Sequence, residues 1–187
     1  DVVATASGGI QNTAVQNFGS SPLMTNVVAT GTGGTTARGV QNSGPSSPVM
    51  RNVVATATDA DLATAVLNVE STPSMIDVTA LADGGGSDNV AVDNVNSSPT
   101  ITNSDIRAAP ALDNSTAVEN TGSSFPRIRG SLLEGETHSV VNNVPQPASS
   151  RIADTTLIGP VGGPNFACIG AHDADYAALG DECEPLP

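Results

Sequence analysis

The chain has few of the residues that build large cores. Among its 187 residues there is no Trp and no Lys, and there are only one Tyr and three Phe. Any core must therefore consist of small aliphatic side chains. Charged residues make up 13% of the chain, about half the usual share, whereas Gly (19) and Pro (13) are frequent. This composition argues against helical bundles and coiled coils and favours strands joined by turns.

Basic side chains are also scarce. The six basic residues are all Arg and stand against 19 acidic residues, which gives a net charge of −13. Nucleic acids and anionic membranes require a basic patch that neutralises phosphates, so we expect neither as a partner. No run of about 18 apolar residues is present, and the chain does not begin with a basic and then apolar leader. We therefore expect no membrane insertion and no signal peptide; if the protein is secreted, this is its mature form or a fragment.

An internal repeat dominates the sequence. Residues 2–26, VVATASGGIQNTAVQNFGSSPLMTN, align with residues 27–52, VVATGTGGTTARGVQNSGPSSPVMRN. The alignment continues with increasing divergence through four further units, at residues 53–77, 78–103, 104–130 and 131–154. Such a period of about 25 residues indicates stacked structural units that bury their apolar faces against one another.

The repeat keeps one residue type at each of several positions. Every unit has Val at one position: Val15, Val40, Val66, Val92, Val118 and Val141. Two residues later every unit has Asn: Asn17, Asn42, Asn68, Asn94, Asn120 and Asn143. A third position holds Met or Ile: Met24, Met50, Met75, Ile101, Ile128 and Ile152. Apolar positions separated by one polar position are typical of strands, and the intervening GG, SSP and single Asn residues are typical of turns.

These positions predict an all-β fold, a right-handed parallel β-helix of about six coils with three strands each. Coils would stack at about 4.8 Å, so the Val and Met/Ile positions would become interior stacks. The six Asn residues would lie above one another and form an asparagine ladder through their side-chain amides. We assign residues 1–158 to the repeats and residues 159–187 to a C-terminal capping or assembly segment.

With units such as GVQNSGPSSPVMRNVVAT, residues 2–158 resemble the secreted bacterial proteins with right-handed parallel β-helix repeats, of the surface or fibre type. The tail FACIGAHDADYAALGDEC is similar to the Cys-containing segment that closes some of these arrays. The wider fold includes polysaccharide lyases, phage tailspikes, adhesins and structural surface proteins. The resemblance therefore implies an architecture and leaves the function open.

Cys168 and Cys183 are the only cysteines and lie outside the repeat. A metal site would need more Cys or His at ligand spacing, and His172 alone is near, so we favour one disulfide over a free thiol or a metal site. A disulfide predicts an extracellular or cell-surface location.

No group of residues predicts a reaction. Asp77, Asp93 and Asp105 fall at different positions of the repeat, and no position gathers the carboxylates. Arg127 and Arg129 alternate on one strand and come closest to a substrate clamp. We expect no catalytic residue, no metal and no cofactor. A β-helix that binds or cleaves polysaccharide is the alternative.

Hydroxyl side chains occur at alternate positions in the first three coils. These positions are Thr5 and Ser7, Thr30 and Thr32, and Thr56 and Thr58. Flat Thr arrays occur on ice-binding β-solenoids, so ice binding is a second alternative. The array ends at the fourth coil. Thr also suits any exposed strand position.

The first coils are nearly uncharged, because Arg38 is the only charged residue between Val2 and Met50. Open β-helix ends present unpaired backbone groups. We therefore predict a structural subunit that stacks head-to-tail on other copies of itself into a fibre. The candidate assembly interface consists of Val2, Val3, Ala4, Val27 and Val28.

Overall fold

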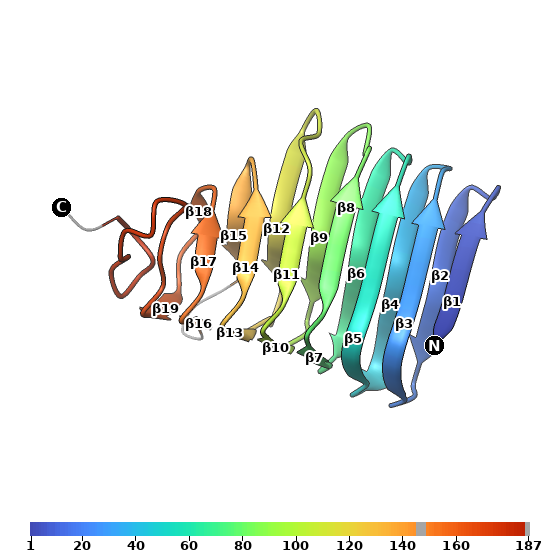
Figure 1. Cartoon of the computed structure of the whole chain (residues 1–187), viewed down its shortest axis with the longest axis horizontal. Helices are drawn as coiled ribbons and strands as arrows, with labels where there is room; N and C mark the ends of the chain where they lie inside the picture. The colour runs from blue at the N-terminus through green and yellow to red at the C-terminus, as the bar shows by residue number, and fades with distance from the viewer. Residues whose placement is uncertain (145–148, 186–187) are drawn as a thin grey trace.

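The computed structural model is a parallel β-solenoid of about six turns, described at residues 1–144 and 149–185 (Figure 1). The described residues form no helix. One sheet has twelve strands: β1 (Val2–Ser7), β3 (Leu23–Thr32), β5 (Val49–Thr58), β7 (Ser74–Ile76), β8 (Thr79–Asp83), β10 (Thr100–Thr102), β11 (Asp105–Ala108), β13 (Arg127–Arg129), β14 (Leu132–Gly135), β16 (Ser150–Ala153), β17 (Thr156–Ile158) and β19 (Phe166–Ile169). The other has seven: β2 (Gln11–Phe18), β4 (Thr36–Ser46), β6 (Leu62–Ser71), β9 (Asp88–Val95), β12 (Asn114–Thr121), β15 (His138–Asn143) and β18 (Val161–Gly162).

The corner inside the twelve-stranded sheet is set by one recurring backbone conformation. At this corner φ is positive, between 49° and 54°, at five non-glycine residues: Asn26, Asn52, Asp77, Asn103 and Asp154. Asn and Asp enter the left-handed region more readily than other side chains because their short polar groups can hydrogen-bond locally. The corner is therefore encoded by residue type. In β3 and β5 the strand continues through it without a break.

Interior columns run the length of the solenoid. Met50, Met75 and Ile101 lie in register and are fully buried, and Ile128 and Ile152 continue the same column. Val40, Val66, Val92 and Val118 form a second buried column. Val15 begins this column and is only partly buried, because it belongs to the first coil.

The asparagine ladder is present. The side-chain amide of each Asn donates to the side-chain oxygen of the Asn on the next coil, at 2.8 Å from Asn17 to Asn42 and at 2.9 Å for the four later steps. The Asn residues from Asn42 to Asn120 are fully buried. These bonds satisfy polar groups that burial would otherwise destabilise.

In the last coil two predicted positions, Val141 and Asn143, are wrong. Asn120 pairs with Asn142, and Val118 pairs with Val140. Asn143 is exposed and Val141 faces outward. The shift keeps a small residue before the core Val, as in the other coils, which have Ala14, Gly39, Ala65, Ala91 and Ala117 there. In the last coil Ser139 takes this position, whereas a core Val141 would place the larger Val140 there.

The pair of neighbouring Asn residues provides a test of the ladder. Asn142→Ala should lower the free energy of unfolding by about 2–3 kcal/mol, because the amide of Asn120 loses its acceptor in a buried site. Asn143→Ala is the matched control and should change it by less than about 0.5 kcal/mol. Urea unfolding followed by far-UV circular dichroism measures both, and equal losses would contradict the observed pairing.

Parallel pairing continues beyond the predicted boundary at residue 158. β18 pairs with β15, and β19 pairs with β16. The last strand ends at Ile169, and His172 then forms a parallel bridge with Thr156 of β17. Residues 170–185 therefore form the segment that we call the C-terminal cover.

Candidate functional site

The edge of the first coil is the most distinctive surface of the molecule (Figure 1, blue). β1 pairs only with β3, and β2 pairs only with β4. In the interior column that begins here, exposure falls from 56% at Val2 to 6% at Val27 and 0% at Val53. An interior apolar column thus reaches an open face.

The hydrogen bonds of the ladder all run in one direction, from the amide of one coil to the side-chain oxygen of the next. The side-chain oxygen of Asn42, like that of every later ladder member, accepts a hydrogen from the coil before it. The side-chain oxygen of Asn17 accepts none from any described residue, although its amide donates to Asn42. The edge therefore presents an acceptor in line with the ladder.

Exposed apolar side chains concentrate on the same coil. The described residues include ten large hydrophobic side chains that are exposed, and half of them belong to residues 2–26: Val2, Val3, Ile10, Phe18 and Leu23. Among the other predicted interface residues, Ala4 is half-buried, Val27 is buried and Val28 is 38% exposed. Large exposed apolar side chains are therefore more frequent on the first coil than on the rest of the described chain.

The opposite end is closed by the C-terminal cover. The backbone amide of Leu157 donates to the carbonyl of His172 at 2.7 Å, and that of Cys168 donates to the carbonyl of Asp181 at 2.7 Å. The Cys168–Cys183 disulfide joins β19 to this segment, and both half-cystines are buried. The predicted disulfide is thus present, and it fastens the cover to the last coil.

Removing this crosslink should loosen the closed end. Cys168→Ser/Cys183→Ser should lower the free energy of unfolding by about 3 kcal/mol, the value that loop-closure entropy gives for a loop of roughly 15 residues. Hydrogen exchange should speed up at the Leu157 and Cys168 amides first. Unchanged exchange at these two amides would show that the cover is held without the disulfide.

A carboxylate pair that the sequence analysis missed lies on the outer face of the seven-stranded sheet. Asp93 and Glu119 are direct partners on β9 and β12. They precede Asn94 and Asn120, so the repeat alignment could have placed them in one column. Val90 and Thr116 are also partners on these two strands and lie near the carboxylates. Both are shielded from solvent, since Val90 is 8% exposed and Thr116 is fully buried.

This environment raises the pKa of Asp93 to about 6, first through burial and then through the charge of Glu119, while Arg38 opposes the shift. Burial also raises the pKa of Glu119, with the charge of Asp88 adding to it and Asn143 and His138 opposing it. The folded protein therefore binds protons at Asp93 that the unfolded chain releases between about pH 4 and 6. Stability falls as the pH rises through this window.

Asp93→Asn should remove most of this dependence. At pH 7.5 the variant should be more stable than the parent chain by about 1–2 kcal/mol, less than the full shift implies because Asp93 keeps some contact with water. The difference should vanish near pH 4. Denaturant unfolding at several pH values tests this, with the exposed Asp113→Asn as control. An equal gain in the control would attribute the effect to net charge.

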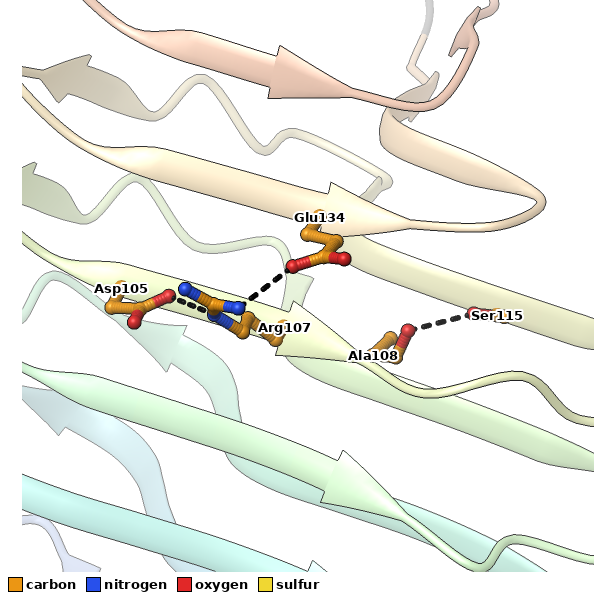
Figure 2. Close-up of polar contacts among 5 residues, drawn as sticks. All are labelled: Asp105, Arg107, Ala108, Ser115 and Glu134. Atoms are coloured by element: carbon orange, nitrogen blue, oxygen red, sulfur yellow. Dashed lines mark hydrogen bonds and ion pairs between the residues drawn. The ribbon is translucent and has the colours of Figure 1, made fainter. Parts of the chain in front are cut away.

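A second charged group lies on the outer face of β11 and β14. Figure 2 shows the guanidinium of Arg107 between two carboxylates: its Nε donates to Asp105 at 2.6 Å and its Nη1 to Glu134 at 3.0 Å. The hydrogen bond with Asp105 is the main reason that the pKa of Arg107 is raised. A cavity of about 420 Å³ lies beside it. Two carboxylates already engage this arginine, so the cavity offers no free positive charge.

The hydroxyl rows are in register over three coils. Thr5, Thr30 and Thr56 form one column, and the next outward column continues from Thr58 to Asp83 on the fourth coil. Leu81 ends the first column at the same coil. The hydroxyl array therefore covers only the first three coils.

The described residues contain no group of three His, Cys, Asp or Glu side chains placed to hold a metal ion. Nor do they form any helix that could cross a bilayer. No protein-family model matches the chain, and no curated protein matches its sequence. The class of the protein, a parallel β-solenoid, therefore rests on its own structure.

Proposed function

We propose that the chain is a non-catalytic structural protein of the extracellular space and forms the closed end of a β-solenoid rod. In this rod a further coil stacks in parallel on the open edge of this chain's first coil, next to β1 and β2. The observation that carries this proposal is the asparagine ladder, which reaches the edge of the first coil with an unfilled acceptor at Asn17. A parallel coil with an Asn at the same position donates a hydrogen to that acceptor.

The geometry favours one direction of growth. A coil stacked on β1 and β2 would cover Val2 and continue the apolar columns, and backbone pairing would fix its register. At the other end the C-terminal cover already uses backbone groups of Leu157 and Cys168, and it is rich in acidic side chains. Head-to-tail stacking of identical copies would require this cover to open. The disulfide supports a location in an oxidising compartment.

Adding a coil tests the proposal. A second copy of residues 27–52 placed before Val2 should raise the free energy of unfolding by several kcal/mol, since the edge of the first coil becomes interior. The same extension with Asn42→Ala in the added copy should recover only part of this gain, because the acceptor of Asn17 stays unfilled. Equal stability of the two extended chains would show that the ladder does not direct stacking.

Microscopy separates the proposal from head-to-tail assembly. The unextended chain should give short particles and no filaments in negative stain, with the mass of a single chain in analytical ultracentrifugation. Filaments that lengthen with concentration would overturn the closed-end proposal and favour stacking of identical copies.

A further inference from the structure

Three of the six arginines lie together on the outer face of β13 and β16. Arg127 and Arg151 are direct partners on adjacent coils, and Arg129 lies two residues along the strand from Arg127. All three side chains are exposed, whereas Ile128 between them is buried. Arg127 and Arg129 were predicted to lie on one strand, and stacking of the coils adds Arg151 beside Arg127.

The arginines border a cavity of about 470 Å³. Its shape follows from the size of the side chains in two outward columns. Ala153 lies between Arg129 and Ile169 in one column, and Ala167 follows Arg151 in the other. The small side chains of Ala153 and Ala167 leave space beside the larger Arg and Ile side chains, and this space is the cavity. No acidic residue lines the cavity, and Thr100 and Thr102 supply hydroxyl groups at one side.

The positive charge of this groove is largely unneutralised. Arg129 pairs with Asp154 at 3.3 Å, in an exposed contact. Within the described residues neither Arg127 nor Arg151 has an ion-pair partner. Like charges directly opposite each other on adjacent strands are destabilising. In a chain of net charge −13, this arrangement leaves two stacked guanidinium groups without an acidic partner.

We propose that this arginine groove binds a linear oligosaccharide that carries carboxylate groups, a uronic acid polymer. Guanidinium groups bind carboxylates with two parallel hydrogen bonds, and two of them repeat here at the coil spacing of about 4.8 Å. The exposed Ile169 and the two alanines offer apolar contact to the sugar rings, and the threonines offer hydrogen bonds to hydroxyl groups. Nucleic acid fits poorly, because the groove has no aromatic side chain for bases to stack on.

Calorimetric titration with hexagalacturonate tests the site. Arg127→Gln/Arg151→Gln should weaken binding by roughly tenfold or more, and raising the salt concentration should weaken binding to the parent chain. Arg51→Gln is the matched control, because Arg51 lies on the same face and in the same outward column as Arg129, outside the cavity. It should leave the affinity within about twofold.

The ligand class is tested with three other probes. Cellohexaose, hexa-aspartate and a sulfated hexasaccharide should all bind more weakly than hexagalacturonate. Binding of cellohexaose with the same affinity would remove the role of charge, and equal or tighter binding of hexa-aspartate or the sulfated sugar would replace the uronate as ligand. Absence of hexagalacturonate binding, or an equal loss in Arg51→Gln, would overturn the site itself.

A stability measurement confirms that the variants fold. Without ligand, Arg127→Gln/Arg151→Gln should raise Tm by about 1–3 °C at low salt, because the stacked charges no longer repel. Hexagalacturonate should raise the Tm of the parent chain by more than that of the double variant at the same concentration. A rise of the same size in both chains would place the sugar elsewhere on the surface and overturn the proposal.

Discussion

Every part of this molecule depends on the parallel pairing of each coil with the next, in a register that places like residues above one another. The pairing aligns Met50 with Met75 and Asn42 with Asn68. The register is costly to change, because a shift by one residue would turn the apolar side chains of a strand outward. The asparagine ladder adds a second constraint, since its hydrogen bonds form only when the Asn side chains coincide.

The same pairing makes the two ends of the solenoid different. A stack of identical rungs has no natural stop, so each end needs a separate solution. At the C-terminal side the chain itself supplies one, the C-terminal cover, which a disulfide fastens to the last coil. At the first coil the apolar columns and the ladder remain open. The proposed role as the closed end of a rod follows from this asymmetry.

Outward side chains are free of the constraint on the interior, and the coils differ there. In the two outward columns that start at Val3 and Thr5, the first three coils carry Val and Thr. Later coils carry Arg107 and Glu134 in the second of these columns, and the arginine groove lies on β13 and β16. Stacking also brings together charges that are about 25 residues apart in the chain. The Asp93 and Glu119 pair and the Arg127 and Arg151 pair both arise in this way. The arginine groove is built from one such outward pair.

The sequence alone determined the repeat, the all-β fold, the ladder over its first five members and the disulfide, because these follow from residue types that recur at a fixed interval. The prediction of the last ladder member was wrong because the interval changed there: Asn142 lies 22 residues after Asn120. Asn142 and Asn143 both satisfy the Val-x-Asn pattern, so the sequence does not distinguish them. Only the structure decided between them, by pairing Val118 with Val140 and placing Ser139 before this core Val. It also decided which charges meet on the outer faces and how the last coil is covered, because these contacts depend on shape and packing between distant segments and leave no periodic pattern in the chain.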